Sequence, residues 1–119
     1  MTTSQHRPVE PVDLPESVRT YLTAHATRDA RAAADAFTPG AVVRDDGRTY
    51  RGAAEVAEFL RAAGGPFTYT TELVEVTHAG TSRWVVRQRL EGDFPGGVVE
   101  LDYRFVLSGG LISELVISP

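Results

Sequence analysis

Cysteine and lysine are both missing from this sequence of 119 residues. The lack of cysteine excludes a disulfide framework, thiolate zinc sites and a cysteine nucleophile, and it fits a reducing compartment. No apolar run approaches the ~20 residues of a membrane span, and Met1–Glu10 has no apolar core of the kind found in signal peptides. We therefore predict a cytoplasmic protein with no membrane partner.

Positive charge is also sparse. The 12 basic residues are all arginine and stand against 16 acidic residues, for a net charge of −4. Arg83, Arg87 and Arg89 alternate with apolar residues instead of forming a basic cluster, so we predict no nucleic-acid partner. The three histidines show no pairing at ligand spacing, so we predict no metal site and no metal cofactor.

The chain length leaves room for one domain. Residues 1–12 carry Pro8 and Pro11 among polar residues and are predicted to form a flexible N-terminal arm. Residues 13–119 then form a single domain, which is long enough to bury a hydrophobic core without a metal or disulfide.

Helices are predicted in the first half of this domain. Asp13 can cap a helix that runs to about Thr27, and Glu16 would complete a capping box. Asp29 is a good cap for a second helix, from Ala30 to Phe37, which Pro39-Gly40 would stop. After a short strand at 41–44, a turn at 45–47 and a return at 48–50, Gly52 opens a third helix. Its inward face carries three apolar side chains: Val56, Phe59 and Leu60.

Strands dominate the second half, where the apolar period changes from about 3.6 to 2. Residues 67–77 alternate loosely, residues 82–91 and 97–107 alternate clearly, and Ser108-Gly109-Gly110 makes a tight turn into a last strand at 111–117. The predicted inner face of the two clearly alternating strands consists of Trp84, Val86, Gln88, Leu90, Val99, Leu101, Tyr103, Phe105 and Leu107. Helices grouped before hairpin strands indicate an α+β fold.

The order of these elements is similar to that of the nuclear transport factor 2-like superfamily, in its SnoaL-like and ketosteroid-isomerase-like branch. The resemblance covers about residues 14–118 and rests on a joint pattern. Its parts are Val18-Arg-Thr-Tyr21, Asp29, Phe37, Ala41-Val-Val-Arg-Asp45, Gly52, Phe59, Tyr103-Arg-Phe105 and Gly109-Gly-Leu111-Ile112. It implies a cone: a curved antiparallel sheet, mixed at one edge, wraps round the three helices of the N-terminal half and leaves an apolar pocket at the open end.

Two residues match the positions of catalytic groups in ketosteroid isomerase. Tyr21 falls where that enzyme has its oxyanion-stabilising tyrosine, and Asp45 falls where it has its general-base aspartate. The same alignment places Leu101 at the position of the second acid. Asp102 lies next to it but on the opposite strand face, so only a one-residue bulge could bring it inward.

Each candidate also has an ordinary structural interpretation. Asp45 is either a proton shuttle with a raised pKa or part of a common Asp-Asp-Gly turn. Tyr21 is either an oxyanion donor or a core tyrosine, and His25, one turn later, is a supporting or rim residue. Gln88 on an apolar face would bind a ligand, bind Tyr21 or lie at the rim. The predicted ligand-binding residues are Phe37, Val43, Phe59, Trp84, Gln88, Leu101 and Tyr103.

Two functions stay open. The resemblance implies either an isomerase or a polyketide-cyclase-like enzyme, acting without a cofactor on a small hydrophobic carbonyl compound, or a non-catalytic module that binds a small molecule or dimerises. Arg83, Arg87 and Arg89 are predicted on the outer sheet face, paired with Glu100 and Asp102. The resemblance also implies a homodimer through that outer face.

Overall fold

The computed structural model describes residues 14–62, 65, 67–80 and 82–119, so the predicted arm at 1–12 lies outside the described residues. No helix within these ranges is long and apolar enough to cross a membrane. The elements in chain order are α1 (Glu16–Thr27), α2 (Ala30–Ala34), β1 (Phe37–Asp45), β2 (Arg48–Arg51), α3 (Gly52–Ala62), β3 (Tyr69–His78), β4 (Arg83–Gly92), β5 (Val98–Ser108) and β6 (Leu111–Ser118).

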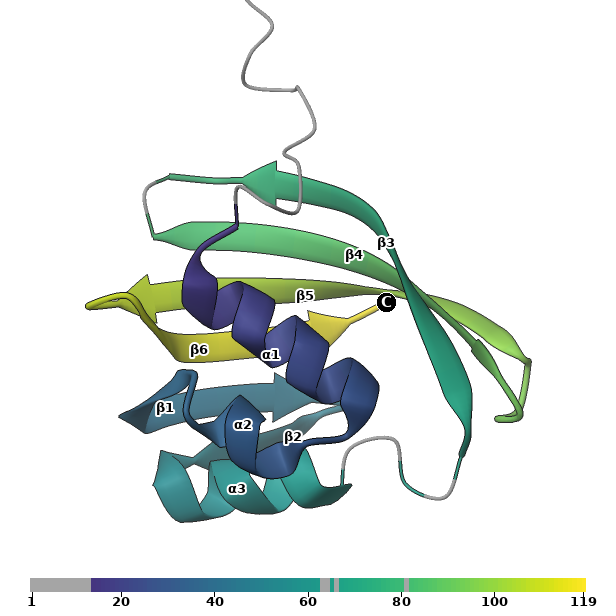
Figure 1. Cartoon of the computed structure of the whole chain (residues 1–119), viewed down its shortest axis with the longest axis horizontal. Helices are drawn as coiled ribbons and strands as arrows, with labels where there is room; N and C mark the ends of the chain where they lie inside the picture. Colours follow the sequence, from purple (N-terminus) through teal and green to yellow (C-terminus); the bar gives the residue numbers. More distant parts are fainter. Residues whose placement is uncertain (1–13, 63–64, 66, 81) are drawn as a thin grey trace, which may run out of the picture.

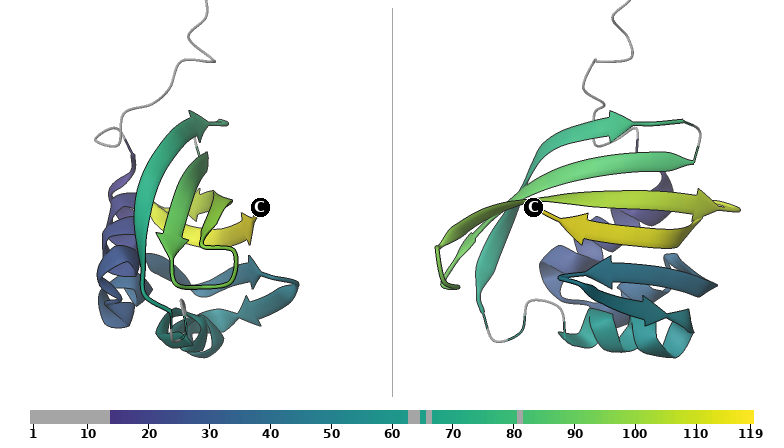
Figure 2. Two further views of the ribbon diagram at one scale, coloured as in Figure 1. Left: turned by 90° about the vertical axis from the view of Figure 1, so that its right-hand side faces the viewer. Right: turned by 180° about the vertical axis from the view of Figure 1, so that it is seen from behind.

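The strands form one six-stranded sheet in the order β2-β1-β6-β5-β4-β3. All neighbouring strands are antiparallel except β1 and β6, which are parallel. The sheet is strongly bent, and the three helices cover its concave side, with α1 lying across the strands (Figures 1 and 2). This is the predicted α+β cone with a mixed edge.

The core lies between α1 and the concave face of the sheet. Its largest fully buried side chains are Tyr21, Tyr103, Phe105, Ile112 and Leu115. The alternation in β4 is the predicted one, because every second residue from Trp84 to Leu90 is buried while its neighbours are partly or fully exposed. Alternate burial of this kind fixes which face of the strand turns toward the helices, since a shift by one residue would expose the whole apolar set.

The outer face of the sheet carries paired charges, as the sequence predicts for Arg87. Its guanidinium lies 3.2 Å from Asp102 and 3.4 Å from Glu100. Arg104 adds a contact of 3.4 Å to the same Asp102. The β4–β5 register runs without a shift from Arg83 to Glu91, so no bulge turns Asp102 inward.

The second helix is shorter than predicted. Asp29 caps it as expected, with its carboxylate accepting a hydrogen bond of 3.0 Å from the Ala32 N–H. The helix nevertheless ends at Ala34, and Phe37 is the first residue of β1, where it pairs with Ile112. Pro39-Gly40 therefore lies in an irregular part of a strand and stops no helix. A single alanine-rich turn gives little helical stability of its own, and burial of the Phe37 ring against the core favours the strand.

The start of α1 also differs from the prediction. Pro15 occupies the N-cap position without a side-chain hydrogen bond, so Glu16 is the first helical residue and not the third. Asp13, the predicted cap, lies outside the described residues. Proline is compatible with this place because its ring already fixes φ near the observed −56° and its missing N–H needs no partner there.

Candidate functional site

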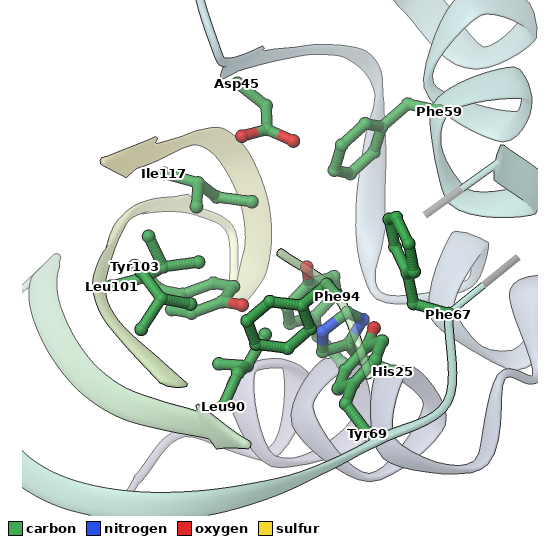
Figure 3. Close-up of a pocket in the computed structure, with 12 residues that line it drawn as sticks. His25, Asp45, Phe59, Phe67, Tyr69, Leu90, Phe94, Leu101, Tyr103 and Ile117 are labelled. Atoms are coloured by element: carbon green, nitrogen blue, oxygen red, sulfur yellow. The ribbon is translucent and has the colours of Figure 1, made fainter. Parts of the chain in front are cut away.

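A cavity of about 270 Å³ opens at the end of the cone where β1, β4 and β6 end and where β3 and β5 begin. Because strands from both halves of the sheet meet there, residues far apart in the sequence share one wall (Figure 3). The wall is mostly apolar and aromatic. It consists of Tyr21, His25, Asp45, Phe59, Phe67, Tyr69, Leu90, Phe94, Val99, Leu101, Tyr103 and Ile117.

Asp45 enters the cavity from the last position of β1. The turn that follows has both Asp46 (φ 53°) and Gly47 (φ 77°) in the left-handed region, which is typical of a tight two-residue hairpin. Ladder pairing with Arg48 on one side and Ile117 on the other then fixes the Asp45 backbone. Figure 3 shows its carboxylate beside Phe59 at one side of the cavity.

The environment of Asp45 raises the pKa of its carboxyl group. Its carboxylate makes no hydrogen bond or ion pair with any residue that the structure describes. Partial burial raises its pKa, and the neighbouring negative charge of Asp46 raises the pKa further. A carboxyl group with a raised pKa can take up and release a proton closer to neutral pH than a fully hydrated one.

Tyr21 enters the cavity from the middle of α1. Its side chain has no exposed surface, and its ring packs edge-on against Phe37 and Phe105, with centroid distances of 5.8 and 5.7 Å. Burial raises the pKa of the hydroxyl well above its ordinary value, and Tyr103, Asp45 and Tyr69 raise it further. The group is therefore a neutral O–H donor, and no partner for it lies among the described residues.

His25 lies one helical turn after Tyr21 and forms part of the same wall. The two rings are stacked, with centroids 5.7 Å apart and planes inclined by 4°. Tyr69 and Tyr103 lie on its other sides, at centroid distances of 6.2 and 6.1 Å. Burial lowers the pKa of the imidazole, and the charge of nearby Arg28 lowers it further, so the ring is neutral.

Arg28 joins the end of α1 to the segment that leads into β3. It adopts a left-handed conformation (φ 58°) just after the helix, and its guanidinium donates hydrogen bonds to the carbonyl oxygens of Gly65 and Phe67. The same group lies 5.0 Å from the centre of the Tyr69 ring. These contacts hold two aromatic members of the wall, Phe67 and Tyr69, against α1.

A second cavity of about 350 Å³ lies between the three helices. His25 belongs to its wall as well as to the wall of the first cavity. The remaining wall residues are Ala24, Arg28, Asp29, Ala30, Ala33, Leu60 and Arg61.

The structure brings five of the predicted site residues together at the first cavity: Tyr21, Asp45, Phe59, Leu101 and Tyr103. Four others do not line it, although all of them are buried: Phe37, Val43, Trp84 and Gln88. Alternation assigned Trp84 and Gln88 to the correct face of β4, but it could not predict how far along the strand the cavity lies. On β4, for example, Leu90 reaches the cavity, whereas Trp84 packs against His78 near the other end of the strand.

His25, which the sequence predicts to be a supporting or rim residue, belongs to the wall. Sequence reasoning missed six further wall residues: Phe67, Tyr69, Leu90, Phe94, Val99 and Ile117. Most of them lie at the end of a strand or just beyond it. Phe67 and Phe94 lie outside the strands, where alternation gives no signal, so no pattern in the sequence pointed to them.

The wall offers acid–base chemistry and no evident metal site. Within the described ranges, no three His, Asp or Glu side chains are grouped as ligands for a metal ion. One carboxyl group, one imidazole and the hydroxyls of Tyr21, Tyr69 and Tyr103 face an otherwise apolar space. Such a set can bind a small apolar molecule and move a proton or stabilise an oxyanion on it.

Comparisons with known proteins agree with this architecture. A candidate polyketide cyclase from Sinorhizobium meliloti is 34% identical, with a TM-score of 0.84 over 92% of this chain and 100% of that chain. A protein from Sphaerobacter thermophilus is 26% identical (TM-score 0.74, covering 87% and 92%). The Δ5-3-ketosteroid isomerase of a Mycobacterium species shares the fold at 20% identity (TM-score 0.71, covering 93% and 94%).

No protein with a curated description matches this sequence. The SnoaL-like domain family, however, matches residues 18–114, from the first helix to the last strand. That range contains Tyr21, His25 and Asp45 as well as strands β1 to β5 and the first half of β6. On its sequence and its fold alike, the chain belongs to the SnoaL-like domain family, within the nuclear transport factor 2-like superfamily.

Proposed function

We propose that this protein is a cofactor-independent isomerase or cyclase that transfers a proton on a small hydrophobic carbonyl compound. The observation that carries the proposal is that Asp45 and Tyr21 line one mostly apolar cavity. Their roles also follow from the resemblance to ketosteroid isomerase, and the candidate polyketide cyclase from Sinorhizobium meliloti supports a related substrate class.

The proposed reaction balances without a cofactor. In a β,γ-unsaturated ketone, the Asp45 carboxylate takes a proton from the α-carbon, the C–H electron pair forms a C=C bond to the carbonyl carbon, and the carbonyl π pair moves onto the oxygen, which gives a dienolate. The Tyr21 hydroxyl donates a hydrogen bond to that oxygen and keeps its own proton, which agrees with its raised pKa. The C=O bond then re-forms, the double bond moves to the α,β position, and the γ-carbon takes the proton back from protonated Asp45, which gives the conjugated ketone.

The proposal predicts turnover of cyclohex-3-en-1-one to cyclohex-2-en-1-one, measured by the ultraviolet absorbance of the conjugated product. Loss of a general base typically lowers the rate by about 10²–10⁴-fold, so Asp45→Asn should reduce kcat by that order. Tyr21→Phe removes one oxyanion donor and should reduce kcat by about 10²-fold or more.

Two substitutions serve as matched controls. Glu58→Gln changes an exposed carboxylate of α3 that does not line the cavity, and Tyr50→Phe removes a hydroxyl from a tyrosine that does not line it either. Both should keep the wild-type rate. Equal rates for the wild type, Asp45→Asn and Tyr21→Phe would reject both assigned roles.

The alternative is a non-catalytic module that binds a small molecule, and one observation favours it. Leu101 lines the cavity at the position where ketosteroid isomerase has its second acid, while the next residue in the sequence, Asp102, pairs with Arg87 on the outer face. A ligand that binds in the cavity without any turnover by the wild type would support this alternative.

The proposed assembly is a homodimer in the cytoplasm, formed through the outer face of the sheet. The family resemblance and the absence of cysteine support this proposal. Sedimentation equilibrium at micromolar concentration should give twice the chain mass of 12.9 kDa. Arg87→Glu should shift the equilibrium toward the monomer, because it places an unpaired negative charge beside Glu100 and Asp102 on that face.

A further inference from the structure

Two polar atoms of α1 are buried without a partner beside the cavity. The Tyr21 hydroxyl and the His25 Nε2 make no hydrogen bond to any residue that the structure describes. A buried polar group without a partner costs free energy, so native proteins seldom keep two of them side by side. Because both residues line the cavity, a molecule that enters it can supply the missing partner.

The surroundings of His25 favour a neutral ring. On its own helix it faces Tyr21 and Arg28, and the opposing elements contribute Tyr69 from β3 and Tyr103 from β5. No carboxylate is paired with it in the described part of the chain, and Figure 3 shows Asp45 at the other side of the cavity. A neutral imidazole carries one N–H, which can donate a hydrogen bond to an oxygen without delivering a proton.

The proposed reaction leaves a place for a second donor. With only the Tyr21 hydroxyl at the developing oxyanion, the site lacks the second group that ketosteroid isomerase has where this chain has Leu101. His25 lies 5.7 Å from Tyr21, measured between ring centroids, and its ring is nearly parallel to the phenol. Two side chains in this arrangement can direct their polar atoms at one oxygen.

We propose that His25 is a ligand-contacting residue whose Nε2–H binds the carbonyl or enolate oxygen of the ligand together with the Tyr21 hydroxyl. The ligand class is then a flat, ring-containing carbonyl compound small enough for a cavity of about 270 Å³ with aromatic walls. The identity of the oxygen as a carbonyl rests on the proposed function. The hydrogen bond from His25 to the ligand oxygen can be tested by binding alone and does not require turnover.

The first test measures binding of 2-naphthol, whose phenolic oxygen imitates an enolate, by fluorescence titration. His25→Phe keeps the size and the aromatic surface of the ring but removes Nε2, and should weaken 2-naphthol binding about tenfold. His25→Gln retains an N–H donor at a similar reach and should stay within about threefold of the wild type. Naphthalene, which lacks the oxygen, should bind to the wild type and to His25→Phe equally well.

His78→Gln is the matched control, because it changes a histidine that stacks on Trp84 and does not line the cavity. It should leave 2-naphthol binding unchanged. The inference is overturned if folded His25→Phe binds 2-naphthol as tightly as the wild type. It is also overturned if His25→Phe and His25→Gln lose equal affinity for 2-naphthol and for naphthalene, since that would indicate a merely structural role.

The second test observes the ring directly. Nuclear magnetic resonance of the 15N-histidine protein should show His25 as the neutral Nε2–H tautomer, with an Nε2 resonance that shifts on addition of 2-naphthol. The inference is contradicted if the ring is protonated only at Nδ1. It is also contradicted if the ring resonances do not shift on addition of 2-naphthol. The resonance is assigned by its absence in His25→Gln.

These results separate the inference from the proposed function. If the wild type does not turn over cyclohex-3-en-1-one but 2-naphthol binding still depends on His25, only the proposed reaction fails. If turnover depends on Asp45 and Tyr21 while His25→Phe leaves the affinity for 2-naphthol unchanged, only the inference fails.

Discussion

On the outer face of the sheet, charged side chains lie in pairs, such as Arg44 with Glu114 at 2.6 Å and Arg87 with Asp102 at 3.2 Å. At the cavity between the inner face and α1, Asp45 of the sheet and Tyr21 of the helix have no hydrogen-bond partner among the described residues. Arg44 and Asp45 show the contrast over a single step of β1, since neighbours on a strand point to opposite faces.

This comparison distinguishes polar groups that have a partner within the fold from polar groups that have none and therefore do not stabilise it. An exposed ion pair contributes little and is easily replaced, whereas a buried polar group without a partner lowers stability. Natural proteins keep such costs mainly where function requires them. The inner polar groups are therefore the ones whose removal should improve folding and impair the site.

The largest effect should come from the apolar part of the inner face. Phe105 is 1% exposed and packs against Tyr21, so Phe105→Ala should lower the free energy of unfolding by about 3–5 kcal/mol. Its neighbour Arg104 faces outward, and Arg104→Ala should cost less than about 1 kcal/mol. Urea denaturation measures both, and similar losses at the two positions would contradict the assignment of faces.

A smaller effect of opposite sign is expected at Tyr21. Tyr21→Phe removes a buried hydroxyl that has no partner in the described structure, and should raise the free energy of unfolding by about 1 kcal/mol. The same substitution should lower turnover of cyclohex-3-en-1-one. Tyr50→Phe serves as the comparison in thermal denaturation, and a lower Tm for Tyr21→Phe would indicate that its hydroxyl has a stabilising partner.

The stability effect at Asp45 should depend on pH. Burial raises its pKa in the folded state, so the folded protein holds this proton more firmly than the unfolded chain does. The resulting stabilisation is fully present below the ordinary pKa of about 3.9 and is lost as the pH rises through the raised folded-state value. Asp45→Asn should therefore raise the Tm at pH 7 relative to the wild type, and this gain should shrink toward pH 4.

Thermal denaturation of the wild type, Asp45→Asn and Glu58→Gln between pH 4 and pH 8 tests this expectation. Glu58→Gln should leave the Tm unchanged across this range, because the Glu58 side chain is exposed on α3. A gain in Tm at Asp45→Asn that grows as the pH falls has the wrong sign for a raised pKa.

The smallest effect should occur at the outer pair of Arg44 and Glu114, whose side chains are 48% and 35% exposed. Arg44→Gln should change the free energy of unfolding by less than about 1 kcal/mol, and the change should diminish in 0.5 M salt. A loss of several kcal/mol that salt does not reduce would show that pairing on the outer face matters for folding.

Periodicity was sufficient to predict the inner and outer faces of the sheet. The alternation from Trp84 to Leu90 has one solution, because a slip of one residue would expose the whole apolar set. The hairpin after Asp45 was predictable for a similar reason, since Asp46-Gly47 suits a turn that needs two left-handed residues. Together with the family pattern, these local rules placed Tyr21 and Asp45 at one cavity.

Depth along a strand could not be predicted in this way. Gln88 and Leu90 share a face, yet only Leu90 lines the cavity, because the bend of the sheet and the path of α1 decide where the core ends. The prediction of a helix up to Phe37 was wrong for a different reason. A run of alanines is compatible with a helix, and only pairing with Ile112 across the sheet turns Phe37 into a strand residue.

His25 is the one residue that the walls of the two cavities described above have in common. One of these cavities lies at the open end of the cone and the other lies among the helices. Replacement of His25 by alanine is therefore expected to connect the two cavities, and water could then reach a molecule in the first cavity from the side of the helices.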